Sequence, residues 1–392
     1  MNPHIKSLCA LSSKSDRIVL GLMSGTSLDG LDLALCKISG SGTNTQCKVL
    51  AFATVDYTQA TKDKILKVFA KKNADLQYLT LLNPWLGELQ ANIINKQLES
   101  WGVSNKEVDL IASHGQTIYH CPKHFHDLPE FNNATLQLGD GDHIAVKTGI
   151  ITISDFRQKH IAAGYEGAPL AQYGDFCLFG DDTSNTLLLN IGGIANFTLI
   201  RQGVSLNEVV CSDIGPGNTM MDQYVKAHFS LAYDRDGLIA ASGTVNSALL
   251  KALSNIDFIN QPMPKTTGPE LFNLDLLDSC VRSASVVDIS KQDIMATLSM
   301  FTAQSIVKHI LDLNICDGVK VLVSGGGAHN STLLKNIALL LGENIYVEKL
   351  NLNGINADSK EAVLFAILAN ECVAADSESS SGLTLGKISL PG

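Results

Sequence analysis

An aspartate ahead of a glycine-rich turn, "DIGPGN" at 213–218, is the arrangement in this chain most suited to chemistry. Asp213 follows an apolar, β-prone run, and a helical pattern begins directly after the turn. A carboxylate in this position can cap a helix, bind a phosphate-bound metal, or take a proton from a reacting group. The residues of this stretch alone leave the three roles open.

Three other turns combine glycine with small polar residues: "SGTSLDG" (24–30), "NIGGIAN" (190–196) and "SGGGAHN" (324–330). Backbone amides in such turns can point together at an anion, and a helix N-terminus after the third turn adds a favourable dipole. Asp29 and Asp32 can position Mg²⁺ or its waters. No Gly-Lys-Ser/Thr is present, so none is a Walker motif. Each turn alone is equally explained as an ordinary connection.

Two polar loops carry side chains that suit a second ligand. "ASHGQT" (112–117) places His114, Gln116 and Thr117 at the end of a strand, where hydroxyl and amide groups can bind a sugar. "SDFRQKHIAAGYEGAPL" (154–170) contains Arg157, which can clamp a carboxylate or a phosphate. A structural histidine and a surface ion pair remain the alternative interpretations of His114 and Arg157.

The elements around these turns alternate between strands and helices. Apolar alternation predicts strands over 17–25, 31–38, 48–57 and 108–117, and again over 185–203, 208–218, 319–324 and 344–350. Helical spacing predicts helices over 60–72, 76–101, 217–230, 245–253, 270–282, 290–314, from 331, and 358–375, with a cap near Thr267. Each half opens on a hairpin, so we expect a duplicated α/β fold with a ligand cleft between two lobes.

Composition excludes several classes of protein. The chain has 392 residues, a net charge of −10, 45% hydrophobic and 17% charged residues, which fits a globular protein and argues against a nucleic-acid surface. No run of about 18 apolar residues indicates a membrane span. The nine cysteines are scattered without a CxxC pair, which predicts free thiols in a reducing cytosol.

The motifs together resemble the anhydro-N-acetylmuramic acid kinases over about residues 18–388. The resemblance rests on "GLMSGTSLDGLDLAL", "IASHGQTIYH", "DFR" before "GAPL", "LLNIGGIANFTLI", "DIGPGNTMMD", "DRDGLIAASG", "TTGPELFN", "SGGGAHN" and "TLGKIS". It implies the duplicated actin-like ATPase fold, of the type shared by sugar kinases, Hsp70 and actin. We expect lobe I over 17–136, completed by 366–392, and lobe II over 137–365.

The resemblance also implies an activity. Members of this family use ATP and Mg²⁺ to open the 1,6-anhydro ring of an amino sugar with water and phosphorylate O6, which gives N-acetylmuramate 6-phosphate and ADP. The reaction belongs to cell-wall recycling in the bacterial cytoplasm, and the family suggests a homodimer. By resemblance, Asp213 is the base that takes the proton of the attacking water.

The remaining site residues are carried over by position. The nucleotide side is expected at Gly25, Thr26, Ser27, Asp29, Gly30, Asp32, Gly192, Gly193, Asn196, Gly325, Gly326 and Asn330. The sugar side is expected at His114, Gln116, Thr117, Arg157 and Glu361.

One departure from the family falls in the loop after "DFR". Members often carry an aspartate and a Gly-Gln pair there, whereas this chain has His160 and "YEG" at 165–167, with Glu166 in the middle. The decoration of the sugar is therefore open, and a kinase for another 1,6-anhydro sugar such as levoglucosan is the first alternative. A non-catalytic ATP-binding regulator is the second, and the presence of Asp213 argues against it.

Overall fold

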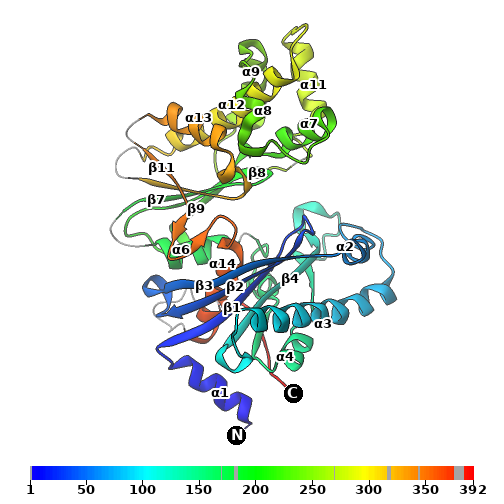
Figure 1. Cartoon of the computed structure of the whole chain (residues 1–392), viewed down its shortest axis with the longest axis vertical. Helices are drawn as coiled ribbons and strands as arrows, with labels where there is room; N and C mark the ends of the chain where they lie inside the picture. Colours follow the sequence, from blue (N-terminus) through cyan, green and yellow to red (C-terminus); the bar gives the residue numbers. More distant parts are fainter. Residues whose placement is uncertain are drawn as a thin grey trace. The chain divides into compact units, whose positions relative to one another are not determined.

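The computed structural model describes residues 2–168, 170–180, 184–268, 270–315, 319–342, 345–374 and 384–392. The chain forms two compact units (Figure 1). Unit 1 comprises Met1–Phe179, Leu352–Ile355 and Ser359–Gly392, and unit 2 comprises Gly180–Asn351 and Asn356–Asp358. Each unit is built around its own sheet.

The sheet of unit 1 has the order β14-β6-β4-β1-β2-β3, with β5 paired to β4. Its strands are β1 (Asp16–Ser24), β2 (Gly30–Ser39), β3 (Gln46–Asp56), β4 (Leu110–Cys121), β5 (Ala134–Leu138), β6 (Thr152–Ser154) and β14 (Lys387–Ser389). Its helices are α1 (Pro3–Ser12), α2 (Gln59–Leu66), α3 (Leu76–Ser100), α4 (Gly141–Thr148), α5 (Phe156–Ala162), α6 (Ala171–Phe179) and α14 (Lys360–Ala374).

Helices cover both faces of this sheet because its central strands are apolar on both sides. Leu20 and Leu22 of β1 face a core that includes Leu86 and Ile94 of α3. On the other face, Gly21 lies so close to α14 that a Cβ would come within 1.9 Å of the Ala362 carbonyl oxygen. Figure 1 shows α3 and α4 along one side of the sheet and α14 on the other.

Unit 2 contains a sheet of the order β11-β10-β7-β8-β9. Its strands are β7 (Thr186–Ile191), β8 (Ile194–Ile200), β9 (Val210–Pro216), β10 (Lys320–Ser324) and β11 (Tyr346–Lys349). Its helices are α7 (Thr219–Phe229), α8 (Leu238–Ala241), α9 (Ser247–Ser254), α10 (Asp257–Asn260), α11 (Leu274–Ser283), α12 (Lys291–Asp312) and α13 (Ser331–Leu341). A separate two-stranded sheet joins β12 (Asn351–Leu352) to β13 (Ile355–Asn356).

The two large sheets repeat one topology. In each, three antiparallel strands in sequence (β1-β2-β3 and β7-β8-β9) are extended on the side of the first by two parallel strands, β4 then β6 and β10 then β11. This repeat confirms the predicted fold class, the duplicated α/β fold of the actin-like ATPases.

The units divide the chain at other points than the expected lobes. The boundary expected at 136/137 falls inside β5, and the one expected at 365/366 falls inside α14. The physical reason is pairing and packing: β6 pairs with β4, and α14 packs on β1 as a single helix, so both stay with the first sheet. The C-terminal segment does complete the first unit, but it begins earlier than 366.

One helix of the described chain is long and apolar enough to cross a membrane. This helix, α12, has 72% of its most apolar window buried inside unit 2, and Phe301 and Ile306 belong to the core there. Burial inside the protein accounts for the apolar character of α12.

Candidate functional site

The turn between β1 and β2, residues 25–29, presents polar side chains to solvent. Thr26, Ser27 and Asp29 are exposed, whereas Leu28 is buried and takes a positive φ of 59°. A positive φ is uncommon for leucine, and here the apolar side chain enters the core of unit 1. Leu28 therefore fixes the turn, while the two hydroxyls and the carboxylate stay accessible to a ligand.

A buried hydrogen-bond network braces the base of this turn. The Oε1 of Gln116 accepts a hydrogen bond of 2.7 Å from Ser24 Oγ, and its Nε2 donates one of 3.1 Å to the Gly25 carbonyl. The next residue of β4, Thr117, accepts a hydrogen bond of 3.2 Å from Gln137 Nε2. Gln116 is fully buried with both ends of its amide engaged, so in this structure it positions the turn.

The two glycines of this turn have different surroundings. A Cβ on Gly30 would lie 2.4 Å from the Val55 carbonyl oxygen, so the close approach of β2 to β3 requires glycine there. A Cβ on Gly25 would meet only Ser27 Oγ, at 3.6 Å. Gly25 therefore leaves open space at the turn, whereas Gly30 serves strand packing.

Arg157 of α5 is held by two hydrogen bonds in unit 1. Its Nε donates to His114 Nε2 at 3.0 Å, and its Nη1 donates to the Gly167 carbonyl at 2.9 Å. For Nη2, no partner is found among the described residues. Because His114 Nε2 accepts, the hydrogen-bond network assigns the ring proton to Nδ1. Burial, with Arg157 adding to it, lowers the pKa of His114 to about 3, so this imidazole stays neutral and orients the arginine.

Glu361 and Asp32 belong to the same electrostatic environment as Arg157. Glu361 lies exposed in the first turn of α14, yet its pKa is raised because the surrounding protein desolvates the carboxylate; Lys360 opposes this shift. Asp32 also raises the pKa of Glu361, and Arg157 lowers it. The carboxylate of Asp32 accepts a hydrogen bond of 2.6 Å from Thr54 Oγ1. Asp32 and Arg157 therefore both act on the Glu361 carboxylate, with opposite signs.

His160, at the departure from the family pattern, supports the loop that also holds Arg157. Its Nδ1 accepts a hydrogen bond of 3.1 Å from the Gly167 amide, and its ring stacks on Tyr165 at 4.6 Å. The side chain is buried, whereas Glu166 is exposed and lies 3.4 Å from His124 Nδ1. His160 therefore positions the Gly167 backbone from inside the protein and does not itself face solvent.

In unit 2, the Gly192-Gly193 turn between β7 and β8 is fixed by the start of α7. The amides of Gly217 and Asn218 donate to the carbonyls of Gly193 and Gly192, at 2.9 and 2.8 Å. A buried hydroxyl on α12, Thr302 Oγ1, donates to the Gly217 carbonyl at 3.1 Å. The "GPGN" stretch therefore holds the tip of the β7–β8 hairpin in place through these hydrogen bonds.

The glycine triplet after β10 lies against the same hairpin. Gly325 has a φ of 78°, and a Cβ there would be 2.5 Å from Asn190 Oδ1. A Cβ on Gly327 would be 2.3 Å from Ile191 Cγ2, but one on Gly326 would meet only Asn218 Nδ2, at 3.7 Å. Packing therefore requires Gly325 and Gly327, and only Gly326 faces open space.

Gly192 and Gly193 share this property with Gly326. A Cβ on either would find no atom closer than 3.6 Å. We call Gly192, Gly193 and Gly326 the open glycines. Their positions give a ligand close access to backbone amides at one end of the sheet of unit 2.

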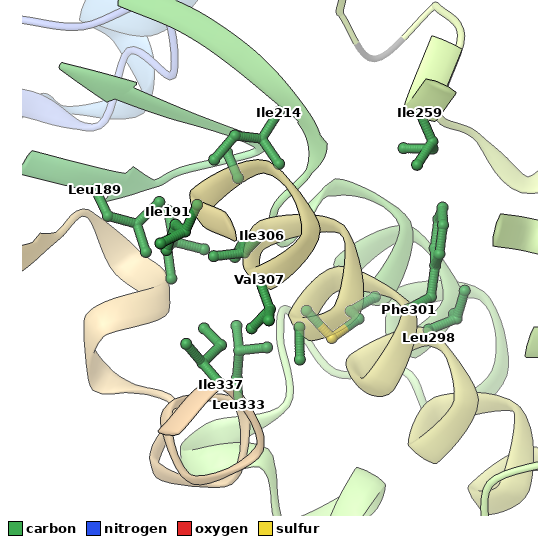
Figure 2. Close-up of a cluster of buried hydrophobic side chains, with 14 of the residues drawn as sticks. Leu189, Ile191, Ile214, Ile259, Leu298, Phe301, Ile306, Val307, Leu333 and Ile337 are labelled. Carbon is green, nitrogen blue, oxygen red and sulfur yellow. The ribbon is translucent and has the colours of Figure 1, made fainter. Parts of the chain in front are cut away.

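Asp213 lies on β9 at an irregularity of the strand pairing. Asn196 of β8 pairs with Asp213 while the preceding Ala195 pairs with Gly215, so Ile214 is the extra residue of a β-bulge. Ile214 is directed into the core beside α12 (Figure 2). Bulges of this kind are common beside active sites, where they redirect a side chain.

The carboxylate of Asp213 is half-buried and oriented by one backbone amide. Thr267 N–H donates to its Oδ2 at 2.9 Å. Burial raises the pKa of Asp213, and the Thr267 hydrogen bond lowers it in part. A carboxylate with a raised pKa and a fixed orientation is suited to accepting a proton.

The helix caps differ in part from the sequence expectations. Among the described residues, no helix begins near Thr267: its N–H donates to Asp213 on β9, and α11 starts at Leu274 with Asn273 as its cap. Asn218 occupies the N-cap position of α7, but its side chain donates to the Ile191 carbonyl instead. Asn330, expected along the nucleotide, is buried and caps α13 by accepting from Leu333 N–H.

The structure thus gathers the predicted residues into two groups, one in each unit. Unit 1 holds the 25–29 turn with His114, Arg157 and Glu361, and unit 2 holds the open glycines and Asp213. Sequence reasoning missed Ser24, Thr267 and Thr302. The "MSGTSLDG" and "TTGPELFN" motifs contained the first two, but no local pattern marks Thr302, whose partner is 85 residues away.

Comparison with known proteins identifies the family. The sequence model of the family described as "Anhydro-N-acetylmuramic acid kinase" matches residues 17–381. The protein of that name from Pseudoalteromonas atlantica is 50% identical over all of both chains, and that from Caldanaerobacter subterraneus subsp. tengcongensis is 39% identical over 93% of each. A solved structure, the activator of the 2-hydroxyisocaproyl-CoA dehydratase from Clostridium difficile with bound ADPNP, aligns over 90% of this chain and 94% of its own, with 13% identity and a TM-score of 0.42.

The family match extends across both units and includes every motif described above except "TLGKIS", at 384–389. It confirms the predicted enzyme class, a phosphotransferase. The chain belongs to the anhydro-N-acetylmuramic acid kinase family.

Proposed function

We propose that this protein uses ATP to open the 1,6-anhydro ring of 1,6-anhydro-N-acetylmuramic acid and to phosphorylate O6. The products are N-acetylmuramate 6-phosphate and ADP. The observation that carries this proposal is Asp213, a half-buried carboxylate with a raised pKa, held by the Thr267 amide on a β-bulge. Membership of the kinase family supports it.

The reaction requires a base because the phosphate acceptor is tied up in the anhydro bridge. Water attacks C1, Asp213 takes a proton from that water, and the electrons of the C1–O6 bond move to O6. O6 then attacks the γ-phosphorus, and the bond to the β–γ bridging oxygen breaks to release ADP. The proton on Asp213 is finally lost to solvent, which restores the carboxylate.

Backbone amides are the proposed phosphate ligands in both units. In unit 2, the open glycines allow phosphate oxygens to approach the backbone without a Cβ in the way. In unit 1, Gly25 and the exposed hydroxyls of Thr26 and Ser27 supply further donors. Gly30, Gly325, Asn196 and Asn330 then contribute by shaping these turns, since packing, strand pairing or a helix cap already accounts for each.

Mg²⁺ is proposed as the metal that accompanies ATP. The described residues hold no group of three or more His, Cys, Asp and Glu side chains able to bind a metal by themselves. This fits Mg²⁺, which is usually bound through one or two carboxylates, phosphate oxygens and water. Asp29 and Asp32 are the carboxylates proposed to hold it. When bound, the ion would neutralise developing charge on the phosphates.

Arg157 is the residue proposed to select the sugar. Its Nε and Nη1 are held by His114 and the Gly167 carbonyl, so the guanidinium is oriented before any ligand arrives. A carboxylate is a natural partner for the remaining Nη2. Anhydro-N-acetylmuramic acid carries such a group on its lactyl ether, whereas levoglucosan carries none. Glu361 and Thr117 are proposed to contact the sugar, and His114 and Gln116 to support these contacts from within.

The cellular setting follows from the substrate. Anhydro amino sugars are released from peptidoglycan, so we propose a role in cell-wall recycling in the bacterial cytoplasm. Eight cysteines within the described part of the chain are free thiols, which agrees with a reducing compartment. A homodimer is also proposed, and light scattering on the purified protein tests it.

The decisive assay supplies ATP and Mg²⁺ with either anhydro-N-acetylmuramic acid or levoglucosan and measures ADP and the phosphorylated sugar. We expect both products with the amino sugar. Products with levoglucosan alone would overturn the substrate, and ATP binding without ADP from either sugar would indicate a regulator.

Arg157→Met sharpens this test. It removes the charge and should raise KM for anhydro-N-acetylmuramic acid by about 10-fold or more, since hydrogen bonds to charged groups contribute about 1.5–3 kcal/mol. Any residual activity on levoglucosan should change little. Lys387→Met in the same unit, which removes a cation paired with Asp155 instead, is the matched control. Equal losses on both sugars would contradict a carboxylate contact.

A further inference from the structure

The segment 265–267 lies along β9 and is hydrogen-bonded to Asp213 and its neighbour. Asp213 N–H donates to the Lys265 carbonyl at 2.9 Å, and Lys265 N–H donates to Ser212 Oγ at 3.0 Å. The third bond is the one from Thr267 N–H to Asp213 Oδ2, at 2.9 Å. This short loop therefore does two things: it pairs with the backbone of the proposed base, and it supplies the hydrogen-bond donor to its carboxylate.

The side chain of Lys265 ties this loop to α10. Its Nζ donates to the carbonyls of Phe258, Ile259 and Gln261 at 2.6, 3.3 and 3.1 Å. The ammonium also lies 4.6 Å from the centre of the Phe258 ring. Carbonyls at the end of a helix lack partners within the helix and attract a cation. One ammonium thus closes the C-terminal end of α10 and fixes where the loop begins.

α10 is itself a fixed support. Ile259 is buried in the core of unit 2 and is labelled in Figure 2 near Leu298 and Phe301 of α12. A Cβ on Gly215, two residues after Asp213, would lie 2.9 Å from Ile259 Cδ1. The helix that receives the lysine is therefore packed against the same strand that carries the carboxylate.

We propose that Lys265 is a positioning residue for the reaction: its ammonium anchors the 265–267 loop to α10 and so holds the Thr267 amide against the carboxylate of Asp213. This role rests on the proposed function of Asp213 as the base. A carboxylate that accepts a backbone hydrogen bond is kept both oriented and more readily ionised. Lys265 touches neither sugar nor nucleotide in this role and acts through Thr267.

Other charged groups surround the ammonium. Lys308 and Asp312 of α12 act on it with opposite signs, and His309 of the same helix is influenced by it in turn. Burial, followed by Lys308, lowers the pKa of Lys265 to about 8. The side chain is therefore still mostly charged at neutral pH, where the anchor is needed.

The first test needs no substrate. Hydrogen exchange of the full-length protein is followed by mass spectrometry in peptides that contain Asp213 and Thr267. Lys265→Met should speed exchange of these amides by roughly 10-fold or more, because the loop opens locally. Lys291→Met is the matched control, since Lys291 also donates to a helix-end carbonyl, that of His228, and lies 6.0 Å from the Phe229 ring. Wild-type exchange in Lys265→Met would overturn the proposal.

The second test uses the sugar-dependent formation of ADP. Lys265→Met should lower kcat by roughly 10-fold, leave KM for ATP unchanged and move the acid limb of the pH profile to higher pH, since Asp213 loses a donor that lowers its pKa. Lys265→Arg should restore most of kcat. A parallel change in kcat and KM for ATP with an unmoved acid limb would refute the positioning role.

A second variant covers the case in which Lys265→Met does not fold, and the wild-type assay separates failure of the proposed function from failure of the positioning role. Lys265→Gln, which removes the charge but keeps a polar end, repeats both measurements if Lys265→Met does not fold. If the wild-type protein forms no ADP with any anhydro sugar, the proposed function fails, whereas the exchange experiment still decides whether Lys265 holds Thr267 and Asp213 together.

Discussion

At the scale of residues, Asp213 combines the two properties that a general base requires. Its pKa is raised by burial, so its conjugate acid is weak enough for it to accept a proton, and the Thr267 amide fixes one oxygen. The sequence predicted this residue from the motif, but the donor that orients it comes from 54 residues further along the chain. Contacts at that separation leave no local pattern to read.

Replacing Asp213 with asparagine should strongly reduce turnover while leaving the fold intact. We expect kcat to fall by about 10²–10⁴ because no proton acceptor remains, with affinity for ATP unchanged in a calorimetric titration. Since the folded pKa is raised, the ionised carboxylate disfavours folding above that pKa, and the variant should unfold at the same or a higher temperature. Asp278→Asn, an exposed change on α11, controls for charge. Near wild-type turnover would remove Asp213 from the mechanism.

Asp222 provides a separate test of the electrostatics of unit 2. It lies half-buried in the first turn of α7, and burial, with Asp234 adding to it, raises its pKa from 3.8 to about 6. The folded protein therefore binds more protons between these values, and stability falls as the pH rises through this window.

Asp222→Asn should remove this penalty. The free energy of unfolding should rise by about 1 kcal/mol at about pH 7.5, a figure reduced for partial solvent screening, and by much less at about pH 4. Urea unfolding at the two pH values measures the difference. A gain of the same size at both would show that titration of Asp222 is not its source.

At the scale of elements, sequence periodicity predicted the long helices and the two hairpins well. The helix expected over 76–101 is α3 (Leu76–Ser100), and the one expected over 290–314 is α12 (Lys291–Asp312). Both are long and carry apolar residues at helical spacing, which is the strongest signal available. The short helices α4, α5 and α6 were not predicted, because seven to nine residues give too few turns for a clear period.

The glycine-rich turns show a second limit of prediction from the sequence. The sequence placed Gly325 and Gly326 together on the nucleotide side, but the fold separates them. Gly325 and Gly327 pack against Asn190 and Ile191 at the end of β7, which lie more than a hundred residues earlier. A position that needs glycine for packing cannot be told from one that needs it for a ligand until the neighbours are known.

Paired alanine substitutions separate these two uses. Gly326→Ala should leave the melting temperature nearly unchanged, because its Cβ would meet only Asn218 Nδ2 at 3.7 Å, yet it should raise the Kd for ATP by roughly 10-fold or more if phosphate approaches this backbone. Gly327→Ala, with a Cβ 2.3 Å from Ile191 Cγ2, should lower the melting temperature. Calorimetry and thermal unfolding measure the pair. An unchanged Kd for Gly326→Ala would exclude the glycine from the phosphate site.

At the scale of the whole molecule, the chain builds unit 1 from both of its ends. The C-terminal helix α14 packs on β1, β2 and β4, and β14 pairs with β6 at the edge of the same sheet. The sequence predicted that a C-terminal segment completes the first half. The predicted start of that segment, residue 366, falls inside α14. An apolar helical run does not show which sheet the helix will cover, so the sequence could not assign the whole helix to unit 1.

Gly21 is a position where a single substitution should disturb the packing of α14 on the sheet of unit 1. It lies in the middle of β1, and a Cβ there would come within 1.9 Å of the Ala362 carbonyl oxygen, a backbone atom of α14 that cannot rotate away. Gly21→Ala must therefore displace the helix from the sheet, at an expected cost of at least about 2 kcal/mol.

Hydrogen exchange should locate this damage in unit 1. Peptides from β1, β4 and α14 should lose protection in Gly21→Ala, whereas those from β7, β8 and α12 keep it, because the two cores are built from separate sets of side chains. Gly25→Ala, just beyond the same strand, has no atom closer than 3.6 Å to its Cβ and should leave every peptide as in the wild type. If protection fell equally in both units, the two cores would fold as one cooperative body, and the division of the chain at residue 180 would have no meaning for stability.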